Sequence, residues 1–120
     1  MTEVELKSRT KQFALRIIRL VESLPKNVAG RAIGNHLVRC GTSVGANYRF
    51  ACRGRSRADF ASKLAIVEEE ADESAFWLEL IVESKLVKPN LITPLLKEAE
   101  ELTRIFAAST RSARRKPPNP

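Results

Sequence analysis

Arginines and lysines are the residues of this 120-residue sequence whose clustering suggests chemistry. They form three groups: one near the start, one around position 53 and one near the carboxyl end. The groups are Lys7, Arg9 and Lys11; Arg49, Arg53, Arg55 and Arg57; and Arg111, Arg114, Arg115 and Lys116. Guanidinium groups suit phosphate because their planar fork donates two hydrogen bonds at once. If the fold brings the groups together, they favour RNA or DNA as a partner.

A simpler interpretation of the same residues stays open. Arg49 and Arg53 fall in the last turn of an expected helix, where cations interact favourably with the helix dipole. The basic residues after position 110 can form a solubilising tail that has no ligand. The sequence contains no RNA-recognition, zinc-finger or helix-turn-helix signature, so any binding should involve backbone phosphates rather than base edges.

The sequence gives little support for catalysis or for metal binding. The chain has one histidine, His36, which leaves no Ser–His–Asp or Cys–His arrangement with an obvious logic. Glu69 and Glu73 are four positions apart, but the Glu-x-x-His pairs of di-iron bundles are absent. There is also no glycine-rich phosphate loop. We therefore expect no enzymatic activity, no metal and no cofactor.

Four polar or aromatic residues interrupt the apolar pattern: Asn47, Glu69, Glu73 and Trp77. Buried polar groups are costly unless they are hydrogen bonded, so Asn47 and Glu73 should each have a partner. We expect a structural role, a hydrogen bond that fixes the register of neighbouring helices or subunits, and a ligand contact is the less favoured alternative. Trp77 should fill the core or an interface and donate its indole N–H to an acceptor such as Glu73. Glu69 belongs to an acidic run that we expect to be a solvated or intersubunit face.

Composition narrows the class of protein. The chain carries 21 Lys and Arg against 14 Asp and Glu, and this net charge of +7 favours polyanionic partners. The start lacks the apolar run of a signal peptide, and no stretch approaches about 18 apolar residues. These features predict a cytoplasmic protein that does not enter a membrane. Cys40 and Cys52 are twelve positions apart in one expected helix, about 18 Å, so they should stay reduced.

Apolar periodicity predicts four helices, over about residues 3–24, 28–53, 57–87 and 91–110. Few glycines and prolines separate them, which argues against a many-stranded β fold. The expected core stripes are Leu6, Phe13, Ile17, Leu20 and Leu24; Ile33, Leu37, Cys40, Val44, Asn47 and Ala51; Phe60, Leu64, Val67, Ala71, Ala75, Leu78 and Val82; and Ile92, Leu96, Ala99, Leu102 and Phe106. Gly41 and Gly45, in mid-helix, indicate close approach by a neighbouring backbone.

These helices bury their stripes most simply as an all-α, antiparallel, up-down-up-down four-helix bundle. The bundle should be one domain over residues 1–110, followed by a disordered, basic, proline-containing tail over 111–120. In this topology the three basic groups share one end of the bundle. Two helices carry more than one apolar stripe, which suggests self-association.

Three motifs carry a family resemblance: Ser43, Val44, Ala46 and Asn47; the helix start Ser56, Asp59 and Phe60; and the spacing of Glu69, Glu73, Trp77 and Leu78. Over roughly residues 10–107 the chain resembles the four-helix-bundle family of small bacterial proteins encoded in intervening sequences of 23S ribosomal RNA genes. It is similar in fold, more distantly, to the accessory protein of diversity-generating retroelements. The resemblance implies a bundle often assembled as a ring of five, with suspected nucleic-acid binding and no established enzymatic activity. For the accessory-protein relatives, binding to nucleic acid and to a reverse transcriptase is attributed to the basic pentamer.

Taken together, these features predict a non-enzymatic, oligomeric protein that binds nucleic acid with low sequence specificity. The competing class is a structural or protein-interaction module, in which the helix over 57–87 docks a partner protein. Its docking surface would be a second stripe formed by Ile66, Glu69, Glu73, Trp77 and Leu80. A membrane-surface role is a weaker third interpretation, because the cations cluster at helix ends and do not line one amphipathic face.

Overall fold

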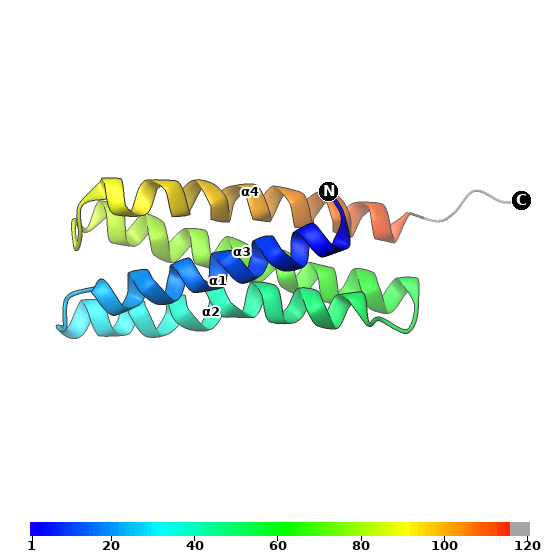
Figure 1. Ribbon diagram of the computed structural model, residues 1–120, viewed down its shortest axis with the longest axis horizontal. Coiled ribbons are helices and arrows are strands. Elements are labelled where there is room, and N and C mark those ends of the chain that lie inside the picture. Colours follow the sequence, from blue (N-terminus) through cyan, green and yellow to red (C-terminus); the bar gives the residue numbers. More distant parts are fainter. Residues whose placement is uncertain (116–120) are drawn as a thin grey trace, which may run out of the picture.

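Four helices make up the fold. The structure is a computed structural model and describes residues 1–115. The helices are α1 (Glu3–Ser23), α2 (Val28–Cys52), α3 (Arg57–Glu83) and α4 (Pro89–Arg114), and the described residues contain no strand. Figure 1 shows that each helix reverses the direction of the one before it. The predicted all-α, up-down-up-down four-helix bundle is therefore confirmed.

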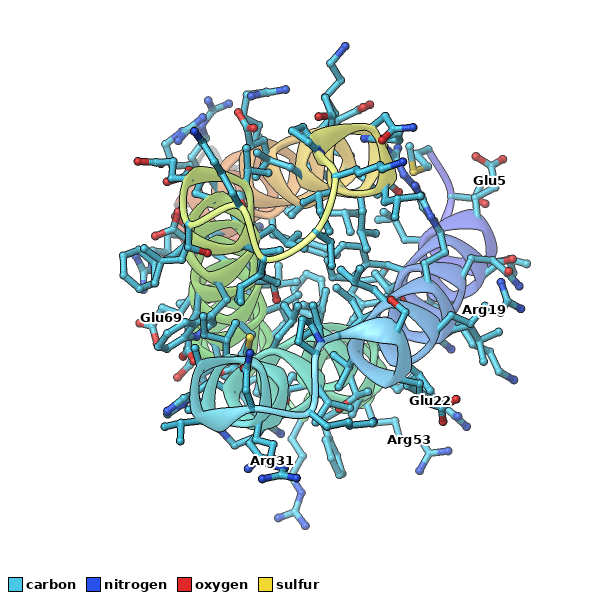
Figure 2. The ribbon with its side chains drawn as sticks, turned by 90° about the vertical axis from the view of Figure 1, so that its left-hand side faces the viewer. Glu5, Arg19, Glu22, Arg31, Arg53 and Glu69 are labelled. Atoms are coloured by element: carbon cyan, nitrogen blue, oxygen red, sulfur yellow. The ribbon has the colours of Figure 1, made fainter. Side chains whose placement is uncertain are left out.

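The helices occupy the corners of a square, with their side chains filling the centre (Figure 2). Consecutive helices pack against each other along their lengths, whereas the closing contact between α1 and α4 is the least extensive. Long-range hydrogen bonds fix the antiparallel order. Arg57 at the start of α3 donates to Ser112 and Ala113 at the end of α4, and Arg39 of α2 pairs with Glu73 of α3.

The buried residues of α1 include the whole predicted stripe, whereas the buried faces of the other helices differ from the predicted stripes. The five residues predicted on α1 are all buried. Five predicted core residues are only half-buried: Ile33, Asn47, Phe60, Val82 and Leu96. Seven other non-glycine residues are buried in addition to the prediction: Thr10, Tyr48, Ala61, Ser74, Ile81, Leu95 and Thr110. The reason is geometric, since a helix with a neighbour on each side buries an arc wider than one row of residues.

Local capping explains where the helices begin. The side chains of Thr2, Asn27 and Ser56 accept hydrogen bonds from the backbone N–H groups of Glu5, Gly30 and Asp59, respectively. The Ser56 cap is the one the sequence predicts. α4 begins at Pro89 rather than at 91, because proline suits the first helical turn, where its missing N–H would have no partner.

The predicted ends of α3 and α4 were wrong. α3 ends at Glu83 rather than 87, because Lys85 adopts a left-handed backbone conformation with φ of 60°. α4 continues to Arg114, four residues beyond the predicted end at 110. Its last turn is stabilised by the buried Thr110 and by the Arg57 side chain, which binds two of its carbonyls. Arg111 and Arg114 therefore belong to the helix, and residues 116–120 of the predicted tail lie outside the described residues.

Mid-helix glycines let α1 approach α2 closely, as predicted. A Cβ at Gly41 would lie 2.8 Å from Cγ1 and from Cγ2 of Ile17, and one at Gly45 would lie 3.3 Å from Oγ1 of Thr10. Cys40 and Cys52 are unpaired, as predicted. Within residues 1–115, none of the helices could span a membrane.

Candidate nucleic-acid interface

The members of the three basic groups that fall within residues 1–115 lie at the same end of the bundle. Figure 1 places the start of α1, the α2–α3 turn and the end of α4 toward one side, with α1 beginning somewhat short of the end. We call this side the basic end. The opposite end holds the α1–α2 and α3–α4 turns. Antiparallel order thus brings together basic groups that are up to about a hundred residues apart in the sequence.

Four of these cations line a groove between α1 and α2. The groove has a volume of about 630 Å³. Its lining is Lys7, Ser8, Lys11 and Ala14 from α1, with Thr42, Gly45, Ala46, Arg49 and Arg53 from α2. The small residues of α2 leave the floor of the groove open, and the long basic side chains stand at its borders. We call this the α1–α2 groove.

Three of the four cations that line the groove have no carboxylate partner among residues 1–115. Within residues 1–115, no carboxylate lies at ion-pair distance from Lys11, Arg49 or Arg53. Lys7 contacts Glu3 at 3.1 Å, and its hydrogen bond lowers the pKa of that exposed carboxyl group. Exposed pairs of this kind contribute little to stability, so Lys7 can exchange partners. The Arg53 side chain points away from the bundle (Figure 2).

Arg9, in contrast, already pairs with two carboxylates of α4. Its Nε donates to Oε2 of Glu98 at 2.8 Å, and its Nη2 donates to Oε1 of Glu98 at 2.7 Å. Glu101 lies 3.0 Å from the same Nη2. These hydrogen bonds raise the pKa of Arg9 above its ordinary value. The geometry therefore places Arg9 at the joint between α1 and α4, with its fork engaged by Glu98.

The remaining basic residues divide between capping and exposure. Arg57 donates from Nε to the Ala113 carbonyl at 2.9 Å and from Nη2 to the Ser112 carbonyl at 3.1 Å, so its fork caps α4. Arg55, Arg111, Arg114 and Arg115 have exposed side chains. Two of them, Arg114 and Arg115, line a separate hollow with Arg57, between the start of α3 and the end of α4. Lys116 lies outside the described residues.

Asn47 does not link α2 to another helix of the chain. Its Nδ2 donates to the Ser43 carbonyl at 2.9 Å, one turn earlier in α2. Val44, Tyr48 and Ala51 face the core instead, and Asn47 is left half-buried at its border. The prediction that this side chain fixes the register of neighbouring helices was therefore wrong within the chain.

A polar and aromatic cluster joins α2 to α3 on another face. The Trp77 indole N–H donates to Oε2 of Glu73 at 3.1 Å, which is the acceptor the sequence predicts. The same carboxyl oxygen accepts from Nη2 of Arg39 at 2.8 Å, and the Trp77 ring stacks on His36 with centroids 4.5 Å apart. Sequence reasoning missed Arg39 and His36, although their spacing of three places them on one helix face. Glu69 points outward from α3, away from the α1–α2 groove (Figure 2).

Glu70 of α3 lies near Arg39 and has one buried carboxyl oxygen that lacks a hydrogen-bond partner among the described residues. Burial raises the pKa of its carboxyl group. Among the described side chains, its Oε2 has no hydrogen-bond partner, and Nη1 of Arg39 approaches it only to 3.9 Å. Within residues 1–115, no group of three metal-binding side chains is present.

Comparison with known proteins identifies the family of this chain. Residues 2–108 match the family of 23S rRNA-intervening sequence proteins. The chain belongs to this family. The chain is similar to a crystal structure of a protein of unknown function from the S23 ribosomal protein family of Bacteroides thetaiotaomicron. The two structures superpose with a TM-score of 0.82 and their sequences are 30% identical. The match covers 92% of this chain and 99% of that chain. No curated protein matches the chain significantly. The predicted resemblance is confirmed, and the match to the family ends within α4, before its basic last turn.

Proposed function

We propose that this chain is a non-enzymatic protein that binds RNA or DNA through backbone phosphates at the α1–α2 groove. One observation carries the proposal: four cations border one groove, and three of them have no carboxylate partner among residues 1–115. A phosphate that enters this groove displaces water and counterions but breaks no ion pair with those three cations. Release of counterions from the nucleic acid drives such binding and makes it depend on salt.

The chemistry of the lining supports low sequence specificity. The groove presents ammonium, guanidinium and hydroxyl groups beside small apolar side chains, and its lining includes no amide or carboxylate side chain. Base edges are read mostly by paired donors and acceptors set in a fixed geometry, whereas phosphates accept from any of these donors. The family description connects these proteins with intervening sequences of 23S rRNA, so RNA is the first ligand to test.

The proposal includes self-association in the cytoplasm, as a homopentamer by analogy with the family resemblance. Ile66 and Phe76 of α3 are 41% and 51% exposed, which supports burial of this face against another chain. A ring of subunits would repeat the α1–α2 groove and raise the avidity for a long polyanion.

The same exposed side chains on α3 favour a second candidate, a protein-interaction module. In that case α3 docks a partner protein beside Trp77 and the acidic residues. Binding that is insensitive to salt and lost on Trp77→Ala would support this candidate over the nucleic-acid proposal.

A pair of charge-matched variants tests the proposal. Arg49→Gln with Arg53→Gln removes two cations from the groove and should weaken binding to an RNA of about 16 nucleotides by about tenfold at about 0.1 M salt. The control is Lys26→Gln with Arg31→Gln, which removes the same charge from a smaller hollow between the same helices at the opposite end. Fluorescence anisotropy should show the control near wild-type affinity. Equal losses for the two variants would contradict the proposal.

A further inference from the structure

Phe50 is a large aromatic side chain that the core does not use. It lies in the last turn of α2, next to Arg49, and it is 61% exposed. The other strongly exposed aromatic residue of the described chain is Phe76, which packs edge-on against Trp77 on the α2–α3 face. Phe50 has no aromatic neighbour of this kind in the described structure, where the stacked and tilted ring pairs involve other residues.

The position of Phe50 relative to the α1–α2 groove is specific. A second hollow, of about 220 Å³, is lined by Ala46, Arg49, Phe50 and Arg53. Three of these residues, Ala46, Arg49 and Arg53, also line the α1–α2 groove. Arg49 and Arg53 therefore form a ridge, one helical turn or about 5 Å long, with the groove on one side and the phenyl ring on the other.

This arrangement combines the two elements that bind single-stranded nucleic acid. Cations hold the phosphates, and an exposed aromatic ring stacks with an unpaired base, whose flat face is available whatever its sequence. A duplex offers the phosphates but keeps its bases stacked inside. A strand that crosses the ridge can place a phosphate between Arg49 and Arg53 and turn its base onto Phe50.

We propose that the groove selects single-stranded over double-stranded nucleic acid, and that Phe50 is the base-stacking residue that makes the selection. This inference rests on the proposed function for its phosphate contacts and adds the structural class of the ligand. The favoured substrate is an unpaired RNA or DNA segment, such as a loop or a free end.

The experiment compares a short single strand with a duplex of the same sequence, for wild type, Phe50→Leu and Phe50→Trp. Phe50→Leu should weaken single-strand binding by about fivefold or more and leave duplex binding unchanged. Phe50→Trp should restore the affinity, and its indole fluorescence, measured against the Trp77 background, should be quenched by the strand. The matched control, Leu91→Ala, removes a large exposed apolar side chain from the start of α4, at the opposite end of the bundle, and should leave both affinities unchanged.

Two results overturn the inference. One is an equal effect of Phe50→Leu on single strand and duplex. The other is a changed mass of the assembly for Phe50→Leu, which would show that a second copy of the chain covers the ring. In either case the proposed function stands if Arg49→Gln with Arg53→Gln still weakens binding, and it fails separately if that variant binds like wild type.

Discussion

Whether an arginine of this chain can bind phosphate depends on what its guanidinium group already holds. Arg9 has its fork filled by Glu98, and Arg57 has its fork filled by two carbonyls of α4. Arg53 borders an open groove and has no carboxylate partner among the described residues. Residue type alone therefore overestimates the number of cations available to a phosphate, because Arg9 and Arg57 are already engaged within the fold.

Glu70 provides a test of pairing at the level of one residue. Its buried Oε2 lacks a hydrogen-bond partner in the described structure, and burial raises its pKa, so the ionised form destabilises the fold. We expect Glu70→Gln to increase the free energy of unfolding at pH 7 by about 1 kcal/mol. Urea denaturation followed by circular dichroism measures this change.

The pH dependence of the stability gained by Glu70→Gln follows from the raised pKa of the Glu70 carboxyl group. A raised pKa means that the carboxyl group contributes stability below its unfolded value of about 4.3 and loses it as the pH rises through the folded value. The advantage of Glu70→Gln should therefore vanish near pH 4 and grow toward pH 7. A gain that is equal at both pH values would contradict this account. Glu69→Gln, at an exposed neighbouring position, is the control.

Some helix boundaries are set by nearby residues in the sequence, and others are set by tertiary contacts. The start of α3 was predictable because Ser56 and Asp59 form its cap within a few residues. The ends of α3 and α4 were not, because they depend on tertiary structure. Lys85 adopts a left-handed conformation that usually selects glycine, and the last turn of α4 is held by Arg57, far away in the sequence.

The close packing of α1 on α2 predicts the effect of a single methyl group. Gly41→Ala places its Cβ 2.8 Å from two carbons of the fully buried Ile17. Overpacking costs about 1–3 kcal/mol and the better helix propensity of alanine returns about 1, so we expect a net loss of about 1 kcal/mol in unfolding free energy.

A double-mutant cycle separates the cost of overpacking against Ile17 from the gain in helix propensity. Ile17→Ala removes both clashing carbons, so Gly41→Ala made in that background should be neutral or stabilising. Chemical denaturation of the four proteins gives the coupling energy. The same loss in both backgrounds would show that the glycine is not required by contact with Ile17.

At the scale of the whole molecule, antiparallel order explains both the success and the failure of the sequence analysis. It places the starts and ends of alternate helices together, so the convergence of the basic groups could be predicted from helix count alone. The α1–α2 groove could not be predicted, because it depends on which helix pair leaves an open floor. Gly45 and Ala46 were its sequence signal, in the middle of an otherwise well-formed helix.

The salt dependence of RNA binding tests the central claim most directly. The slope of log affinity against log salt concentration should be steep for wild type and should flatten by about 1.4 for Arg49→Gln with Arg53→Gln, since each lost phosphate contact of a single strand changes it by about 0.7. The variant Lys26→Gln with Arg31→Gln should keep the wild-type slope. A slope that is the same for wild type and for the groove variant would contradict the assignment of the α1–α2 groove as the phosphate-binding surface.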